Sequence, residues 1–356
     1  MKSKIDIKNW QLIRAKSKEE RLDLTEQQFV TVGKKAFCGG RQEEILLPST
    51  ASACKARAFA GCRRLKTVVL STECNTGLSV SVFSNCERLK RIKNSQLLSV
   101  IGERAFANCL MLEQMEFGND LLRIGKFAFE GCRSLERISL PPRLESLGKG
   151  AFAGCTELQQ AGLPGSLSML AEDLFRGCIS LAEVEIPTGI SLLPKGAFRD
   201  CSALSSLTIP GNVQTVGTKA FFGCARLKQV TIELGVQRIA ARAFAHTPRL
   251  REVVIPRSVK RIGFGAFGFG KRKEEDKITL LVENEYMARR LRRLVLFCGS
   301  AGCVSVSVFG KTIEERKRER HRADLNAEPV HLSALYAPPN VVACAVLTHH
   351  ATVLTH

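Results

Sequence analysis

The sequence predicts a repeat solenoid of α/β type, in which about eleven short units stack to form a parallel sheet of short strands with short helical turns. Three observations support this prediction. Phenylalanine is abundant, with 19 Phe against one Trp and two Tyr in 356 residues. Eleven of these Phe residues recur at a nearly constant spacing, and the residues around them recur in the same register. A unit this short cannot enclose a core alone, but stacked units bury one another's faces.

The Phe positions define the repeat. Their intervals are 22 and 24 residues, and then 23 residues eight times in succession. The residue before the Phe is Ala in nine units, and the sixth residue after it is Leu in nine units. The third residue after it is Cys in eight consecutive units. Each position therefore becomes a ladder along the stack, whose central rungs are Phe106, Phe129, Phe152, Phe175, Phe198, Cys109, Cys132, Cys155, Cys178 and Cys201.

Each unit contains three predicted pieces in order. The pattern L-x-x-I-x-L-P, as at Ile138 and Leu140, alternates apolar and polar residues and predicts a short strand with one buried face. The proline that follows, Pro141 in this unit, ends the strand. L-x-x-I-G predicts a second, shorter extended piece. G-x-x-A-F-x-x-C has near-helical spacing, which predicts a turn or two of helix entered at a glycine such as Gly148.

This pattern resembles the BspA-like, or Treponema-type, class of leucine-rich repeat proteins. The stretch LERISLPPRLESLGKGAFAGC, residues 135–155, matches the unit of that class nearly throughout. The resemblance recurs in register over most of the chain. It implies a leucine-rich repeat solenoid whose strands line one face, and a role in adhesion or recognition. The first unit departs from it at Gly40 and the tenth at Thr247, where Cys is expected, and such decayed end units are typical of capping repeats.

Four segments are expected along the chain. Residues 1–30 form an N-terminal flanking or capping segment, and residues 31–282 form the solenoid. Residues 283–322 form a C-terminal capping and charged segment, and residues 323–356 form an irregular or disordered tail. Within the third segment, residues 311–322 are expected to form a short charged helix.

Two stretches near the C-terminal end of the repeats need separate interpretation. Residues 277–291, KITLLVENEYMARRL, resemble the closing strand and helix of this family. Residues 294–310 are uncharged over 17 residues, which is the short limit for a membrane span. This second stretch is interpreted as a buried terminal strand or capping segment, with a membrane-associated segment as the alternative.

The 14 cysteines raise the question of chemistry at thiols. A nucleophilic Cys needs a base, and residues 31–270 contain one histidine, His246. A metal site needs ligands converging at one point, whereas ladder cysteines form a row. Bridges between neighbouring rungs are conceivable from the strand spacing, but stacked side chains point in parallel. The ladder is therefore expected to be a buried structural row of thiols, with no catalytic residue, metal site or cofactor.

A glycine pattern near the end of the repeats gives a weak cofactor signal. Residues 263–270, GFGAFGFG, contain G-x-G-x-x-G, the pattern of dinucleotide-binding loops. Gly263 falls on the glycine that precedes the Phe in other units, as Gly125 does. The repeat register therefore accounts for this glycine better than a phosphate site does.

The residues that face outward from the first strand of each unit are the candidate partner-binding face. They lie seven, eight and ten residues after each Phe. This face is expected to be basic at its N-terminal end and acidic in its centre. The candidates are Lys66, Lys90, Arg91, Lys93, Glu113, Glu116, Glu136, Glu183, Glu185, Lys228 and Arg251.

The formal net charge is +19, and most of the excess lies in the repeats rather than the tail. Many of these charges fall near the Phe turns, where a basic stripe would attract an anionic partner. The favoured function is a non-catalytic scaffold that binds a protein through its repeat surface. The alternatives are a surface or membrane-associated adhesin-like protein and a targeting or regulatory subunit of an enzyme. No apolar run of signal-peptide length opens the sequence, so a cytoplasmic location is expected ahead of a surface or nuclear one.

Overall fold

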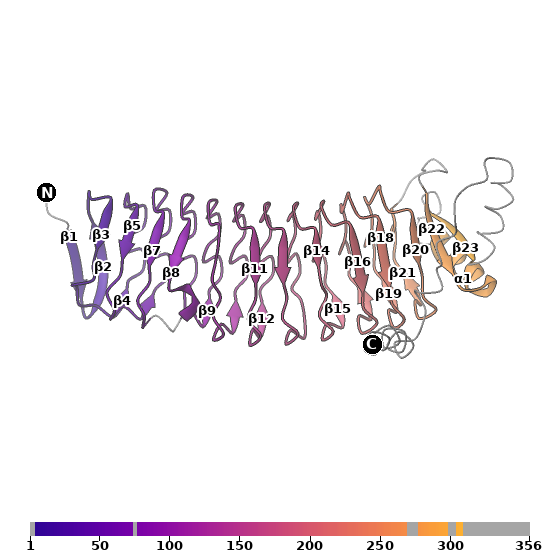
Figure 1. The fold of residues 1–356 in the computed structure, drawn as a ribbon, viewed down its shortest axis with the longest axis horizontal. Coiled ribbons are helices and arrows are strands. Elements are labelled where there is room, and N and C mark those ends of the chain that lie inside the picture. The colour runs from indigo at the N-terminus through magenta and orange to yellow at the C-terminus, as the bar shows by residue number, and fades with distance from the viewer. Residues whose placement is uncertain (1–3, 74–76, 269–276, 298–303, 309–356) are drawn as a thin grey trace, which may run out of the picture. The chain divides into compact units, whose positions relative to one another are not determined.

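The computed structural model describes residues 4–73, 77–268, 277–297 and 304–308. All of them belong to one compact unit, Met1–Phe309. Within it the chain winds as stacked coils, and most coils contribute one strand to each of two parallel ladders (Figure 1). A parallel solenoid of about eleven repeats is confirmed. The charged helix predicted over residues 311–322 and the irregular tail predicted over residues 323–356 lie outside the described residues.

The first ladder, here called the long-strand ladder, is formed by the L-x-x-I-x-L segments. Its pairs are parallel, with registers such as Arg137 to Gln160 to Glu183, one repeat of 23 residues per step. Apolar residues of these strands point inward and alternate with exposed ones. The strands are β3 (Arg21–Asp23), β5 (Glu44–Leu46), β7 (Thr67–Val69), β8 (Arg91–Lys93), β11 (Arg137–Ser139), β13 (Gln160–Gly162), β14 (Glu183–Val184), β16 (Ser206–Ile209), β18 (Gln229–Ile232), β20 (Glu252–Val254), β22 (Ile278–Val282) and β23 (Val304–Val308).

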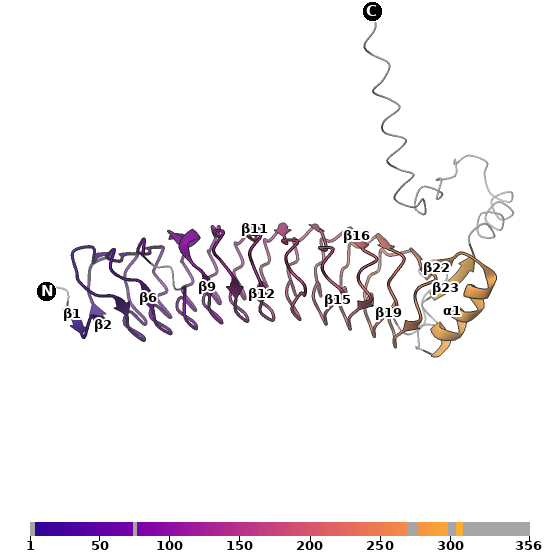
Figure 2. The same ribbon diagram turned by 90° about the horizontal axis from the view of Figure 1, so that it is seen from below.

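The second ladder, the short-strand ladder, is formed by the L-x-x-I-G segments. Figure 2 shows β9, β12, β15 and β19 on the side of the coils opposite β11 and β16. A 3-10 helix, η1 (Ser95–Leu97), precedes β9. The strands are β2 (Gln11–Lys16), β4 (Thr31–Val32), β6 (Ala53–Cys54), β9 (Val100–Ile101), β10 (Arg123–Ile124), β12 (Ser146–Leu147), β15 (Leu192–Leu193), β17 (Thr215–Val216), β19 (Arg238–Ile239) and β21 (Arg261–Ile262).

Both ends of the coil stack are built differently from its middle. At the N-terminal end, β1 (Lys4–Lys8) pairs antiparallel with β2, while β2 and β3 each begin one ladder. Residues 11–30 therefore add a coil ahead of the first repeat. At the C-terminal end, β22 leads into α1 (Glu285–Phe297), and β23 pairs with β22. The closing strand and helix predicted over residues 277–291 are present, and residues 304–308 form the terminal strand expected there.

The Phe residues form the central spine of the core. All eleven are at most 2% exposed. Neighbouring rings stack with centroids 4.8–5.9 Å apart and interplanar angles of 2–18°. Each ring is thereby covered by the coils on both sides, because a 23-residue repeat places identical side chains at identical heights.

The helical turn predicted around each Phe is not formed in the described repeats, which have overlapping turns in its place. In one unit, Ala153 N–H bonds to Gly150 O and Cys155 N–H bonds to Phe152 O, each a three-residue step. The intervening N–H groups of Phe152 and Gly154 bond instead to the next coil.

Backbone conformation explains why no helix forms there. Gly150 and Gly154 have φ of 59° and 73°, in the left-handed region. Positive φ recurs two residues before the Phe in every unit, and two residues after it in all ten units described at that position. A right-handed helix cannot pass through two left-handed residues, so the chain turns sharply and bonds alternately within and between coils.

Candidate interaction surface

The outward face of the long-strand ladder carries the residues predicted from the sequence. Lys66, Arg91 and Lys93 are exposed at its N-terminal end, and Lys228 and Arg251 are exposed at its C-terminal end. The central acids lie between these two groups on adjacent coils. The register that places Phe at the core thus also places these side chains on one face of the stacked coils.

The basic N-terminal end of this face is partly neutralised. Lys66 Nζ lies 2.6 Å from Glu43 Oε2, and Arg64 Nη2 lies 3.1 Å from Glu43 Oε1. Hydrogen bonds from Lys66 and Arg64 hold the pKa of the Glu43 carboxyl below its ordinary value. Lys90 Nζ lies 2.9 Å from Glu113 Oε1, and this hydrogen bond likewise lowers the pKa of Glu113. Two of the predicted bases are therefore held by acids of neighbouring coils.

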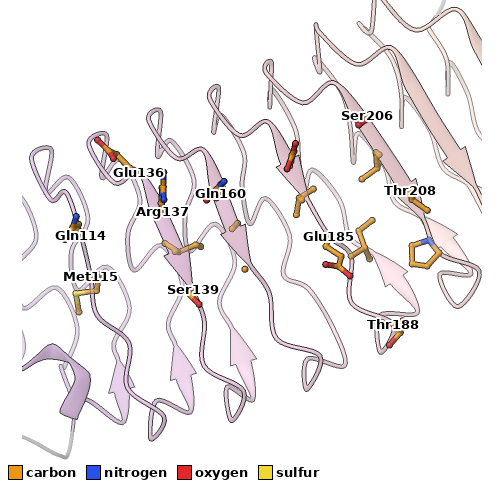
Figure 3. Close-up of a pocket in the computed structure, with 18 of the residues that line it drawn as sticks. Gln114, Met115, Glu136, Arg137, Ser139, Gln160, Glu185, Thr188, Ser206 and Thr208 are labelled. Carbon is orange, nitrogen blue, oxygen red and sulfur yellow. The ribbon is translucent and has the colours of Figure 1, made fainter. Parts of the chain in front are cut away.

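The centre of the face is a groove of about 1260 Å³ that crosses six successive coils. The predicted acids Glu113, Glu116, Glu136, Glu183 and Glu185 all line it. Figure 3 shows Glu136 and Glu185 with the polar side chains of neighbouring strands along this groove. The face is therefore acidic where it is hollowed.

Four residues at the middle of the groove were missed by the sequence reasoning: Arg137, Ser139, Gln160 and Gly162. Their signal was present, because the outward positions eight and ten residues after Phe129 and Phe152 contain them. Selection by charge alone passed over three of them because they are neutral. Arg137 is the one Lys or Arg among the lining residues.

The basic residues near the Phe turns do not form an uninterrupted positive stripe. Lys149 Nζ lies 2.9 Å from Glu172 Oε2, and Arg104 Nη1 lies 3.0 Å from Glu130 Oε2. The Arg104 guanidinium also lies over the Phe127 ring, 4.7 Å from its centroid. Ion pairs between coils thus screen part of the charge that the sequence concentrates there.

The cysteine ladder is buried and hydrogen-bonded. Each of the eight thiols donates to the main-chain oxygen of the Phe one coil earlier, at sulfur–oxygen distances of 3.0–3.3 Å. All eight are free thiols. Burial raises the pKa of Cys109, Cys132 and Cys155, and raises that of Cys224 to about 12. A thiol held protonated and away from solvent is a poor nucleophile and a poor metal ligand.

The first rung of this ladder differs from the rest. The pKa of Cys62 is lowered, mainly by its interaction with the neighbouring Cys86 thiol. The pKa of Cys86 is raised well above its ordinary value, mainly by burial. His246, the one histidine of residues 31–270, packs its ring 4.7 Å from the Phe222 ring and not against a ladder thiol.

Two kinds of feature are absent from the described part of the chain. No group of three or more His, Cys, Asp or Glu residues in it is arranged to hold a metal ion. No helix in the same part has the length and apolar character needed to cross a membrane.

Comparison with known proteins gives one family. A family model of the BspA-type leucine-rich repeat region, which contains six repeat copies, matches residues 17–126, 76–205 and 151–271. These ranges overlap and together cover more than half of the chain. Among curated proteins no sequence relative was found.

Several solved structures are similar to this chain at low identity. A leucine-rich cell surface protein from Faecalibacterium prausnitzii A2-165 is 17% identical, with 90% of this chain and 94% of that chain covered and a TM-score of 0.44. A leucine-rich repeat protein from Bacteroides ovatus ATCC 8483 is 18% identical, covering 86% of this chain and 98% of that chain, with a TM-score of 0.46. The leucine-rich repeat protein of T. pallidum is 24% identical, covering 59% of this chain and 79% of that chain, with a TM-score of 0.34.

Proposed function

This chain belongs to the BspA-type leucine-rich repeat family, and on that premise we propose that it is a non-catalytic scaffold that binds a protein through its long-strand face. The observation that carries the proposal is the groove of about 1260 Å³ across six coils of this face. Stacked repeats present such extended surfaces, and the side chains on them are not needed for the core.

The non-catalytic part of the proposal rests on the cysteine ladder. Its thiols are the nucleophile candidates that recur with the repeat, yet they are buried and donate to main-chain oxygens. Residues on the outward face are Glu, Gln, Ser and Thr on separate strands, which suits recognition better than chemistry at one point.

Site-specific photo-crosslinking of the full chain tests this proposal. A photoreactive amino acid placed at Gln160 or Thr208, both exposed on the long-strand face, should capture the same protein from cell extract. Placed at Lys126 or Lys195, which are exposed near the Phe turns, it should capture far less. Capture from the Phe-turn positions alone, or no capture from either pair, would contradict the proposed role of the face.

The cytoplasmic location stays a prediction. Fractionation of cells, followed by salt and carbonate washes of the membranes, tests this location. A protein that stays with the membranes through both washes is not cytoplasmic.

A further inference from the structure

The middle of the groove contains a hollow where strand β13 has no side chain at one of its two outward positions, Gly162. Strand β13 consists of Gln160, Ala161 and Gly162. Ser139, on the preceding coil, pairs with Gly162. In the next coil Ala161 pairs with Val184, so Glu185 follows at the level of Gly162. The hollow over Gly162 is therefore bordered by Ser139 on one side and Glu185 on the other.

The backbone does not require glycine at this position. A Cβ added to Gly162 would meet its nearest atoms at 3.6–3.8 Å, which is ordinary contact. Gly148 is different, because its Cβ would lie 2.3 Å from the backbone of the previous coil. The equivalent place holds valine in two other coils, Val69 and Val254. The missing side chain is thus a feature of the surface rather than a need of the fold.

Four acids of the groove outnumber its one lining cation, Arg137, and are not ion-paired with it. Glu116, Glu136, Glu183 and Glu185 form no ion pair with any residue that the structure describes. Glu113, at the edge of the groove, is by contrast bound by Lys90. In a chain of net charge +19, unpaired carboxylates gathered in one concave surface focus a negative potential that selects cations.

The shape of the groove favours an extended polar segment. Its outward residues include Gln114, Ser139, Gln160 and Thr208, and these offer hydrogen bonds to an extended segment. Six coils spaced by about 4.8 Å span about 24 Å, which corresponds to about seven extended residues.

We propose that the groove binds an extended, positively charged segment of a partner protein, with a Lys or Arg side chain in the hollow over Gly162 and its cation against Glu183 and Glu185. This inference rests on the proposed function and specifies the chemistry of the partner. The stem of the inserted side chain covers Gly162, where no outward side chain opposes it.

Fluorescence anisotropy with the full chain tests the charge requirement. The probe is a labelled peptide of alternating lysine and glycine, and a glutamate–glycine peptide is its counterpart. The lysine peptide should bind, and its affinity should fall as the salt concentration rises. The glutamate peptide should not bind. Glu183→Gln combined with Glu185→Gln should weaken binding by about tenfold or more. The matched control is Glu145→Gln combined with Glu157→Gln, which removes two exposed charges outside the groove and should leave binding unchanged.

The hollow is tested without a change of charge. Gly162→Val should lower the affinity for the lysine peptide several-fold, because the valine side chain occupies the hollow. Gly162→Ala should change this affinity little. Circular dichroism melts establish that each variant is folded. Equal affinities for the wild type, the groove variants and the control pair would overturn the proposal.

Two outcomes separate this proposal from the broader one. If light scattering shows that the wild type self-associates and the Glu183 and Glu185 variants do not, the occupant is a second copy and the proposed partner chemistry is wrong. If photo-crosslinking captures a protein on the long-strand face while the lysine peptide fails to bind, the scaffold function stands and the basic segment is rejected.

Discussion

The thiol of Cys155 donates a hydrogen bond to the main-chain oxygen of Phe129 on the preceding coil, with 3.3 Å between sulfur and oxygen. The same oxygen accepts the N–H of Cys132 at 3.1 Å within its own coil. The Phe129 carbonyl therefore accepts one hydrogen bond from the turn in its own coil and a second one from the next repeat. The cysteine at this register joins adjacent coils, in addition to filling space.

Replacement of Cys155 by alanine should destabilise the protein mildly. It removes one buried donor from the Phe129 oxygen and leaves a small cavity, which together cost about 1–2 kcal/mol of unfolding free energy. Urea denaturation measures the change. Cys38→Ala, at an exposed cysteine outside the ladder, is the control and should shift the unfolding free energy by less than about 0.5 kcal/mol. Equal losses for the two variants would contradict the role of the ladder.

The ladder thiols should resist alkylation in the native protein. Cys155 is fully buried, and burial raises its pKa, so little thiolate is available to react. Cys38 is exposed and should react at once. Peptide mapping after brief iodoacetamide treatment, with and without denaturant, measures both. Rapid modification of Cys155 in the native state would show that it is not buried.

Truncation of a central Phe should be far more damaging than a change at the surface. Phe152 is sandwiched between the rings of Phe129 and Phe175, at 5.2 Å and 5.9 Å. Phe152→Ala should cost about 3–5 kcal/mol, because the stack cannot collapse into the space. Lys149→Ala breaks an exposed ion pair with Glu172 and should cost far less. Thermal melts of the two variants measure the difference in stability. Similar shifts in melting temperature would refute the assignment of Phe152 to the core position of the repeat.

Stability should fall as the solution becomes alkaline. Burial raises the folded-state pKa of Cys224 to about 12, whereas a thiol in the unfolded chain titrates near about 8.5. Above about pH 8.5 the unfolded chain therefore releases a proton that the folded chain keeps. Each such thiol lowers the unfolding free energy by up to about 1.4 kcal/mol per pH unit.

Denaturation midpoints between about pH 8 and pH 10 measure this dependence. Below that window the thiols are protonated in both states and their contribution to the unfolding free energy is fully present. The midpoint should therefore not change with pH because of these thiols. Cys224→Ala removes one titrating group and should show a shallower decline than the wild type. A decline of the same steepness in both proteins would mean that Cys224 does not contribute.

Much of the fold could be predicted because a repeat displays its core many times. Phe152 at its 23-residue spacing predicts a buried spine, and alternation at Ile138 and Leu140 predicts an inward-facing strand. The helical turn was mispredicted because A-F-x-x-C has helical spacing. The residues two before and two after the Phe, such as Gly150 and Gly154, take a left-handed backbone that ends helical geometry.

The candidate surface was predicted only in part, for a similar reason. The register placed Glu183 and Glu185 on the outward face, but the neutral residues of that face were not chosen. Gly162 and Ser139 carry no charge, so their position in the hollow became visible only when neighbouring coils were in place.

The sequence by itself determined what lies on each ladder, because stacking identical units puts identical positions at the same height. The tertiary structure alone decided which neighbours interact across coils. It directs the Cys155 thiol to Phe129 and pairs Lys90 with Glu113. It leaves Glu185 beside an empty place over Gly162. These contacts depend on the offset and turn geometry of successive coils, which residue spacing does not specify.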